Sequence, residues 1–580
     1  MESLLKIANA KANHWLNSNI DQSTKEQVRK LLDNPDTKEL IDSFYKDLEF
    51  GTGGLRGIMG AGANCMNQYT VGAATQGLSN YLKKSLPSKE ISVAIAYDSR
   101  NNSKYFAQIT ANVFSANGIT VHLFPELRPT PLLSFAIRHL KCDSGVVITA
   151  SHNPKEYNGY KAYWSDGAQL VPPHDKNVIT EVSAITSFDQ VKFTADQSRI
   201  RSIGPDVEDA YYAEVIQRVP KKESIKKQKG ISLVYSSLHG AGITMVPECL
   251  QRLGFENVHV VQEQKIPDGN FPTVQSPNPE ERSAMQIALT KATELNAELV
   301  MATDPDTDRV GFGIKNNKNE FFLLNGNQAF SLMMWFILKN LPGGQAGLKE
   351  KKDAYIAKTI VTTELVDDMA HSLGVACYNT LTGFKYIAEL MRKLENKKKF
   401  IAAGEESYGY MVGDFVRDKD AVSACAFFAA MAAAAKDDGL TLYDWLLQMY
   451  VENGFYKEGL INLVRKGADG EQQIKAMMEK FRNDPPQTLA GEKIVRLLDY
   501  KTGLEKDLIS GKTSPLALPK SDVLQFYTDR GSKVSVRPSG TEPKIKFYVS
   551  VKSNLASGND FDTVNAELEE KIAALGKVLT

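Results

Sequence analysis

Residues 91–100 read ISVAIAYDSR, and residues 103–118 read SKYFAQITANVFSANG. The first run is short, apolar and rich in β-branched residues, which is typical of a buried strand, and it ends directly in small and polar residues. The second run is typical of a helix. Strands that alternate with helices are the pattern of α/β proteins, so this stretch predicts an α/β fold.

The same pattern recurs along the chain. Strand-like runs that end in polar loops occur at SGVVITASHNP (144–154), ISLVYSSLHGAG (231–242), ELVMATDPDTDR (298–309) and FIAAGEESYG (400–409). Helix-like stretches lie between them, for example NQAFSLMMWFILKNL (327–341) and YIAELMRKLEN (386–396). Open α/β sheets bind ligands outside the carboxyl ends of their strands, where we expect these loops to lie.

The chain length indicates several domains. At 580 residues the chain exceeds what one hydrophobic core usually organises, and we expect about four domains. We place them at 1–215, 216–345, 346–465 and 466–580. The charged stretches KKESIKKQKG (221–230) and GGQAGLKEKKD (343–353) are either boundaries or solvated loops.

Composition and charge exclude several classes of protein. Hydrophobic residues make up 42% of the chain and charged residues 24%, which is typical of globular proteins. The 69 Lys and Arg residues balance the 69 Asp and Glu residues, so the basic excess that nucleic-acid binding needs is missing. We therefore expect no nucleic-acid partner.

Cysteine usage and apolar runs indicate the compartment. The five cysteines are an odd number without a CxxC pair, which favours neither disulfides nor a zinc site and suits a reducing cytoplasm. The N-terminus has no apolar core of a secretory signal. The apolar run AVSACAFFAAMAAAA (421–435) is too short to cross a bilayer and predicts a buried helix, so we expect no membrane contact.

An acidic loop follows one predicted strand. In ATDPDTDRVGFG (302–313), Asp304, Asp306 and Asp308 occupy alternate positions. Three carboxylates in one short loop repel each other unless a cation joins them, and oxygen ligands favour Mg²⁺ or Ca²⁺. An EF-hand needs Gly where Arg309 stands, so that site is excluded. The alternative is an acidic surface turn.

A serine loop follows another predicted strand. TASHNPKEYNGYK (149–161) displays Ser151, with His152 and Lys161 close in sequence. A nucleophilic serine needs a neighbouring base or an electrophilic centre, and both groups qualify. The G-x-S-x-G pattern of esterases is absent around Ser151. An ordinary turn is the alternative.

Three further loops carry polar residues suited to a sugar phosphate. RPSGTEPK (537–544) offers Arg537 and a turn that suits a phosphate dianion, and no Walker loop competes with it. GEESYG (404–409) and TGFKYI (382–387) offer two carboxylates and a lysine that suit sugar hydroxyls. GTGGLRG (51–57) is not a dinucleotide motif, and its Arg56 suits an anion. A plain β-turn is the alternative for RPSGTEPK, and a solvated acidic loop is the alternative for GEESYG.

The chain resembles the α-D-phosphohexomutase superfamily, specifically its phosphoglucomutase and phosphomannomutase members, over nearly its whole length. The resemblance rests on motifs that occur in the family's order: GTGGLRG, TASHNPKEYNGYK, DPDTDR, TGFKYI with GEESYG, and RPSGTEPK. The resemblance implies three related α/β domains with mixed sheets and a smaller α+β C-terminal domain around a central cleft. It implies interconversion of hexose 1-phosphate and hexose 6-phosphate through a phosphoserine and a bound hexose 1,6-bisphosphate.

The resemblance also implies roles for individual residues. Ser151 is the phosphorylated residue, and it binds Mg²⁺ together with Asp304, Asp306 and Asp308. The remaining catalytic residues are His152, Lys161, Arg56 and Arg309, and the substrate-binding residues are Lys385, Glu405, Ser407, Arg537, Ser539, Gly540 and Thr541. Lys161 as a general base requires a depressed pKa, for which neighbouring cations are the expected cause.

The resemblance leaves several choices open. Glucose is the favoured sugar and mannose the next, whereas a phosphopentomutase or a glucose 1,6-bisphosphate synthase is the alternative within the superfamily. An aspartate-nucleophile phosphatase also places DxD after a strand, and a non-catalytic sugar-phosphate-binding protein is the third hypothesis. The partner is a small sugar phosphate, and the chain is expected to be a monomer or a weak homodimer.

Overall fold

The computed structural model describes residues 2–51, 54–341, 353–465, 470–539 and 544–579. The chain forms two compact units, each described by itself. Unit 1 comprises Met1–Leu324, Ala388–Glu395 and Ser407–Asp437, and unit 2 comprises Asn325–Ile387, Asn396–Glu406 and Asp438–Thr580. The four predicted domain boundaries stay predictions.

The first sheet of unit 1 is mixed. Its six strands follow the order β1-β5-β4-β2-β3-β6. Their bounds are Gly54–Ile58 (β1), Ser92–Tyr97 (β2), Thr120–Leu123 (β3), Ser144–Ile148 (β4), Tyr157–Trp164 (β5) and Ile200–Ser202 (β6). Strand β2 runs parallel to β3 and β4, whereas β5 is antiparallel to β4 and β1. The helix predicted at 103–118 is α5 (Ser103–Ala116).

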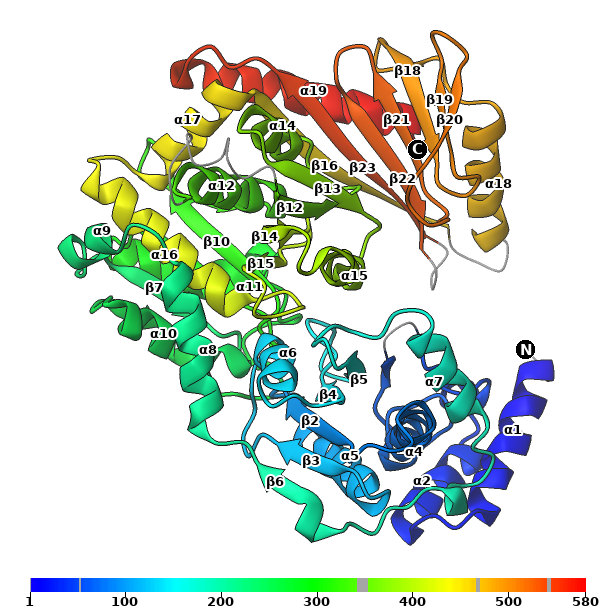
Figure 1. Ribbon diagram of the computed structural model, residues 1–580. Coiled ribbons are helices and arrows are strands. Elements are labelled where there is room, and N and C mark those ends of the chain that lie inside the picture. The colour runs from blue at the N-terminus through cyan, green and yellow to red at the C-terminus, as the bar shows by residue number, and fades with distance from the viewer. Residues whose placement is uncertain (1, 52–53, 342–352, 466–469, 540–543, 580) are drawn as a thin grey trace. The chain divides into compact units, whose positions relative to one another are not determined.

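Helices cover this sheet (Figure 1). Helices α5 and α6 contact β2 and β4, while α4 contacts α5 and α7. The N-terminal helices α1 to α3 pack on this domain through a core of their own around Trp15 and Phe44. The bounds are Glu2–Asn17 (α1), Gln22–Asp33 (α2), Lys38–Phe44 (α3), Gln68–Ser85 (α4), Thr130–His139 (α6) and His174–Ser183 (α7).

The second sheet of unit 1 has five strands in the order β11-β10-β9-β7-β8. Their bounds are Leu233–Ser236 (β7), Val258–Val260 (β8), Leu299–Thr303 (β9), Val310–Lys315 (β10) and Phe321–Leu324 (β11). Strand β7 is parallel to β8 and β9, and β10 is antiparallel to β9 and β11. Further elements of the unit are Pro205–Arg218 (α8), Lys222–Lys227 (α9), Val246–Leu253 (α10), Arg282–Glu294 (α11) and Tyr410–Val412 (β15).

The Ala-rich run forms a buried helix, as predicted. It is α16 (Ala421–Asp437), and every residue from Ala421 to Ala435 is buried. The helix contacts β9 and β10 of the second sheet. Small alanine side chains allow this close approach of helix and sheet. No helix among the described residues is both long and apolar enough to span a membrane.

Unit 2 begins with a parallel sheet. Strands β13, β12 and β14 lie side by side in that order and run parallel. The bounds are Ala354–Thr359 (β12), Ala376–Thr380 (β13), Lys399–Gly404 (β14), Gly326–Lys339 (α12), Leu365–Ser372 (α14) and Leu442–Asn453 (α17). Helix α15 (Phe384–Leu394) belongs to unit 2 up to Ile387 and to unit 1 from Ala388 on. Helix α12 contacts both α14 and α17. The stretch 343–353 lies almost wholly outside the described residues.

The C-terminal part of unit 2 is an antiparallel sheet with two helices. Its main order is β16-β23-β22-β21-β18-β19-β20, and β17 pairs with β18. Figure 1 shows helix α19 running beside β16 and β23, both of which it contacts. The bounds are Phe455–Val464 (β16), Thr488–Leu489 (β17), Glu492–Asp499 (β18), Leu504–Asp507 (β19), Thr513–Pro515 (β20), Leu524–Thr528 (β21), Lys533–Pro538 (β22), Lys544–Ser553 (β23), Gly470–Asn483 (α18) and Phe561–Leu579 (α19).

The fold class is therefore confirmed: α/β domains with mixed sheets are followed by a smaller α+β region.

Candidate active site

The serine loop follows β4 in unit 1. Ser151 is buried and has a φ of 53°, a left-handed conformation that is uncommon for a residue with a side chain. Its amide donates to Thr149 Oγ1 at 2.8 Å. Its hydroxyl donates to Asp304 Oδ2 at 2.7 Å and lies 3.2 Å from His152 Nδ1. The loop thus directs the serine oxygen at the aspartates.

The return strand β5 needs a glycine beside this loop. A Cβ at Gly159 would lie 2.4 Å from the Thr149 carbonyl oxygen, and real Cβ contacts are not that short. The amide of Thr149 donates to the Gly159 carbonyl at 3.0 Å. The Asn158-Gly159 pair therefore lets β5 approach the serine loop closely and bring Lys161 to the site.

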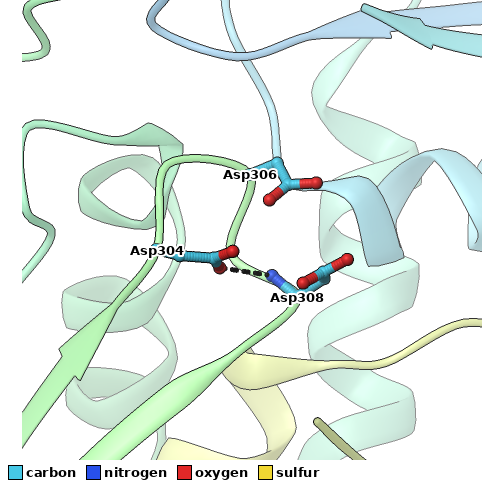
Figure 2. Close-up of side chains that lie close together, drawn as sticks. All are labelled: Asp304, Asp306 and Asp308. Carbon is cyan, nitrogen blue, oxygen red and sulfur yellow. Dashed lines mark hydrogen bonds between the residues drawn. The ribbon is translucent and has the colours of Figure 1, made fainter. Parts of the chain in front are cut away.

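The aspartate loop connects β9 to β10. Asp304, Asp306 and Asp308 are all buried, and one carboxylate oxygen from each lies within 4.8 Å of the others. Figure 2 shows the three side chains close together, with the backbone of Asp308 donating to the carboxylate of Asp304. Asp304 Oδ1 accepts from the amides of Asp308 and Arg309 at 3.1 and 3.0 Å. These bonds shape the loop from within.

Two lysines reach the aspartates. Lys161 Nζ lies 2.7 Å from Asp306 Oδ2 and 3.3 Å from Asp308 Oδ2. Lys419 Nζ lies 3.1 Å from Asp308 Oδ2 and 3.1 Å from Asp418 Oδ1. Lys419 is therefore shared between the loop and another carboxylate.

The arginines occupy the edge of the site. Arg309 Nη1 pairs with Glu280, and its Nε lies 3.9 Å from Asp308 Oδ1. Arg56 lies on β1, in register with Gly159 of β5, and its Nη1 donates to Asn153 Oδ1 at 3.3 Å. Arg56 is exposed on its strand, as an anion contact requires.

The aspartate loop fits a divalent cation. Among the described residues, the Oδ1 atoms of Asp306 and Asp308 are buried without a hydrogen-bond partner. Buried polar atoms normally have partners, so these oxygens have unused capacity to bind a ligand. Three carboxylates and the adjacent Ser151 hydroxyl are a hard, all-oxygen donor set, which suits Mg²⁺.

The charges of the site shift its pKa values. Burial, with Asp306 and Asp308 next, raises the pKa of Asp304 well above its usual range. Burial lowers the pKa of His152 to about 3, and Arg309 and Arg56 act in the same direction. With its pKa lowered this far, His152 carries no charge at pH 7.

The expectation of a depressed pKa at Lys161 is wrong for this structure. Burial does lower the pKa of Lys161, but Asp306 and Asp308 outweigh it and raise the pKa above the usual value. Lys419 is one of the expected cationic neighbours and lowers the pKa of Lys161, but its effect is smaller than that of either carboxylate. Two carboxylates within hydrogen-bond reach dominate the balance.

The predicted sugar-binding residues divide between the units. Ser407 is half-buried in unit 1. In unit 2, Glu405 is buried and accepts from the Gly383 amide at 3.0 Å. Lys385 is half-buried on α15, and its ammonium lies 5.1 Å from the Tyr386 ring centre.

The predicted phosphate loop is described only in part. Arg537 lies near the end of β22, and the Ser539 amide donates to the Lys544 carbonyl at 2.7 Å. Tyr548 lies near both Arg537 and Glu405, as the electrostatics of its hydroxyl indicate. Burial raises the pKa of Tyr548 to about 12. Glu406 and Glu405 raise this pKa further, and Arg537 lowers it. Gly540 and Thr541 lie outside the described residues.

Sequence reasoning missed several residues of the site. Besides Lys419, Thr130 Oγ1 donates to Asp306 Oδ2 at 3.0 Å, and Asp418 Oδ2 accepts from Tyr163 at 2.7 Å. A signal did exist for Asp418 and Lys419, because the charged run RDKD (417–420) stands directly before the buried helix α16. Thr130 offered none.

Comparison with known proteins identifies three domains. The family model described as "Phosphoglucomutase/phosphomannomutase, alpha/beta/alpha domain I" matches residues 47–189. The models for domains II and III of the same family match residues 209–317 and 325–450. The serine loop falls in the first match, the aspartate loop in the second and the GEESYG loop in the third.

Relatives and solved structures cover nearly the whole chain. A phosphoglucomutase of Staphylococcus haemolyticus is 36% identical over 527 residues, which cover 90% of this chain and 94% of the relative. One from Staphylococcus aureus (strain USA300) is 37% identical over 539 residues, covering 92% and 95%.

Two solved structures share the fold. One is a Paramecium phosphoglucomutase (parafusin) with a TM-score of 0.68 at 18% identity, covering 92% of this chain and 95% of that one. A putative phosphomannomutase from Thermus thermophilus has a TM-score of 0.65 at 22% identity, covering 90% and 99%. Together with the domain matches and the whole-length relatives, they show that the chain belongs to the phosphoglucomutase/phosphomannomutase family of the α-D-phosphohexomutase superfamily and is a mutase of the phosphotransferase class.

Proposed function

We propose that the protein interconverts hexose 1-phosphate and hexose 6-phosphate, with glucose as the preferred sugar, and that Ser151 carries the phosphoryl group between them. The observation that carries the proposal is the 2.7 Å contact between Ser151 Oγ and Asp304 Oδ2. A serine hydroxyl beside a cluster of cation-binding carboxylates suits phosphoryl transfer, in which positioning and charge neutralisation supply most of the catalysis. The staphylococcal relatives named phosphoglucomutase support glucose.

Ser151, Asp304, Asp306 and Asp308 would hold Mg²⁺. The ion supplies charge neutralisation for phosphoryl oxygens when bound. Buried carboxylates with unused oxygens support this assignment. The choice of Mg²⁺ over other divalent ions rests on the donor set alone.

The chain's own residues carry the transfer. In the forward half-reaction the bond between phosphorus and Ser151 Oγ breaks, a bond to sugar O6 forms, and the O6 proton goes to Lys161. The bound hexose 1,6-bisphosphate then turns over, its other phosphoryl group returns to Ser151, and Lys161 gives its proton back to the sugar oxygen. Lys161 acts as a base only where the charge of Asp306 and Asp308 is compensated, since those carboxylates otherwise keep it protonated.

Substrate binding is assigned to both units. Arg56 and Arg309 bind oxygens of the transferring group, and neutral His152 donates or accepts a hydrogen bond there. Lys385, Glu405 and Ser407 hold sugar hydroxyls, and Arg537 with Ser539, Gly540 and Thr541 holds the phosphate that is not transferred. The common neighbourhood of Arg537 and Glu405 around Tyr548 supports this pairing of sugar and phosphate contacts. We also propose that the protein acts in the cytoplasm as a monomer or a weak homodimer.

The decisive experiment maps the phosphate. The purified protein is incubated with glucose 1,6-bisphosphate and Mg²⁺, turnover of glucose 1-phosphate is measured, and the modified residue is identified by peptide mass spectrometry. We expect an acid-stable phosphate on Ser151 that resists hydroxylamine. Ser151→Ala should lose turnover while it still binds glucose 1-phosphate. A hydroxylamine-labile phosphate on Asp304 would instead identify an aspartate-nucleophile phosphatase.

The sugar is settled by a parallel assay. Glucose, mannose, N-acetylglucosamine, ribose and deoxyribose 1-phosphates are compared at equal concentration with catalytic bisphosphate present. We expect the highest kcat/KM for glucose 1-phosphate. A pentose as the best substrate would contradict the hexose assignment and leave the phosphoserine assignment intact.

A further inference from the structure

A buried arginine holds the backbone of the serine loop. Arg100 follows β2 and is only 3% exposed. Its Nη1 donates to the carbonyls of Pro154 and Tyr157 at 2.9 Å each, and its Nη2 donates to Ser151 O at 2.6 Å and to Asn153 O. One guanidinium therefore binds four carbonyls of one loop, which no other side chain has the donors to do.

An aspartate and a threonine complete this arrangement. Asp98 is 2% exposed; its Oδ1 accepts from the Arg100 amide at 3.0 Å, and its Oδ2 lies 3.5 Å from Arg100 Nε. The same Oδ2 accepts from Thr149 Oγ1 at 2.6 Å. Thr149 Oγ1 in turn accepts from the Ser151 amide at 2.8 Å. A continuous chain of hydrogen bonds thus runs from Asp98 to the serine backbone.

The loop that leads from η4 (Gln262–Gln264) toward α11 covers the arginine. The Arg100 guanidinium carbon lies 5.1 Å from the ring centre of Phe271, which is 2% exposed. In the same loop, Ser276 Oγ donates to the His152 carbonyl at 3.1 Å. Contact with an aromatic face adds to the binding of a guanidinium. Both the serine loop and its support are therefore covered by the domain that carries the aspartate loop.

The conformation of Ser151 explains why such support is needed. A left-handed conformation is strained for a residue with a side chain and persists only where the surroundings over-determine it. In an ordinary conformation at residue 151 the side chain would leave in another direction, away from Asp304. The strain and the hydrogen bonds that maintain it meet at the same residue.

We propose that Asp98, Arg100 and Thr149 form a serine clamp, a set of positioning residues that keeps Ser151 left-handed so that its oxygen faces the aspartate loop. The clamp touches no reacting atom and acts through the backbone of residues 149–157. Its catalytic consequence rests on the proposed function of Ser151, whereas its structural consequence does not.

The first test replaces the arginine. Arg100→Lys keeps the charge but has one point donor for four separated carbonyls. We expect the rate of Ser151 phosphorylation by glucose 1,6-bisphosphate, followed by rapid quench and mass spectrometry, to fall about 10²-fold, the effect of a misplacement of about 1 Å. The KM for glucose 1-phosphate should change little. Arg482→Lys is the matched control, because Arg482 is also largely buried but binds Asp499 and Asp522.

The second test covers the case in which Arg100→Lys does not fold. Thr149→Val removes the hydroxyl and leaves the Ser151 amide unpaired, which should slow phosphorylation about tenfold. Thr149→Ser keeps the hydroxyl and should restore the rate. A role in stability alone would lower the melting temperature of Thr149→Val without slowing phosphorylation of the folded protein.

A third readout separates the clamp from the proposed chemistry. Hydrogen exchange of the peptide spanning 149–157 is measured in the unphosphorylated protein, and Arg100→Lys and Thr149→Val should lose protection there while Arg482→Lys keeps it. If the wild type takes no phosphate on Ser151 but these losses occur, the proposed function fails and the clamp stands. Wild-type phosphorylation rates and unchanged protection in the folded Arg100 and Thr149 variants would overturn the clamp.

Discussion

Each unit buries a cluster of charges, and the two clusters are built differently. In unit 2, Lys358 Nζ lies 2.7 Å from Asp367 and 3.3 Å from Glu364, and Lys533 pairs with Glu364 and donates to the carbonyls of Ile360 and Thr362 at 3.1 Å each. We call these four charged residues the lysine cluster. Two ammonium groups there pair with two carboxylates, and backbone carbonyl oxygens accept further hydrogen bonds from Lys533.

The aspartate loop of unit 1 lacks this match. Two of its cationic neighbours are shared, because Lys419 also pairs with Asp418 and Arg309 also pairs with Glu280. Among the described residues, Asp306 Oδ1 and Asp308 Oδ1 have no hydrogen-bond partner. Asp367 Oδ2 of the lysine cluster has none either, but it lies 2.7 Å from the ammonium of Lys358. A buried charge cluster that is matched internally serves the fold, whereas one with unused oxygens is prepared for a ligand. The comparison makes opposite predictions for the two clusters.

The largest effect is expected from Asp304→Asn. Removing one of three repelling carboxylates takes away cation binding, so we expect kcat to fall about 10³-fold. The free energy of unfolding should stay the same or rise, because burial and repulsion by Asp306 and Asp308 raise the pKa of Asp304 and thus disfavour its charge in the folded state. Steady-state kinetics and a urea titration of the same preparation measure both. Near-normal activity together with lost stability would make the loop a structural cluster.

Glu364→Gln is the counterpart in the lysine cluster. Lys358 and Lys533 lose their shared carboxylate, and leaving buried charges uncompensated should lower the free energy of unfolding by about 3 kcal/mol at pH 7. The kcat of the folded protein should change little. If this variant keeps its stability, the lysine cluster does not stabilise the fold and the contrast with the aspartate loop is wrong.

The pH dependence sharpens this prediction. Burial raises the pKa of Glu364, but Lys358 and Lys533 outweigh it and lower the pKa to about 2. A carboxylate with a depressed pKa stabilises the fold above its unfolded value, and this stabilisation is lost as the pH falls toward 2. The difference between wild type and Glu364→Gln should therefore shrink below about pH 4.5, the usual pKa of Glu.

Metal removal and addition distinguish the clusters directly. At Mg²⁺ concentrations near 100 times its Kd, the ion should stabilise the chelator-treated protein by about 2.7 kcal/mol, provided that it binds only the folded state. Thermal unfolding with and without Mg²⁺ measures the gain. Glu364→Gln should keep the gain and Asp304→Asn should lose it. Equal gains in both variants would place the ion elsewhere.

The smallest effect concerns Glu458, which adjoins the lysine cluster. Burial raises the pKa of Glu458 to about 7, although Thr363 and Lys533 act in the opposite direction. A raised pKa means that the folded state holds the proton longer, so stability falls as the pH rises from about 4.5 to about 7, by about 2 kcal/mol. Glu458→Gln should flatten this part of the stability profile. An unchanged slope in the variant would show that another group titrates there.

The sequence predicted the parts of the site that are contiguous. A strand followed at once by DPDTDR or by TASHNP places polar side chains at a strand end, and both loops lie there in the structure. The sequence also predicted the strand and helix within 91–118 and the buried helix at 421–435, because these elements depend on local periodicity.

Contacts between distant segments could not be predicted from the sequence. Thr130, Arg100 and Lys419 come from three separate parts of the chain, and each reaches the site only because helices and strands pack in one particular way. The pKa of Lys161 failed as a prediction for the same reason. The direction of this pKa shift depends on whether carboxylates or cations come within about 3 Å of the Lys161 ammonium. The residues that neighbour Lys161 in the sequence do not reveal which of the two comes this close.

By itself, then, the order of residues determined the α/β class, the polar loops and the kind of chemistry they offer, since side-chain type and periodicity are local properties. Tertiary structure decided that Ser151 faces Asp304, that two carboxylates raise the pKa of Lys161, and that Arg100 binds the backbone of the serine loop. Electrostatic and hydrogen-bond energies change steeply over a few ångströms, so they are determined only when the packed chain sets those distances.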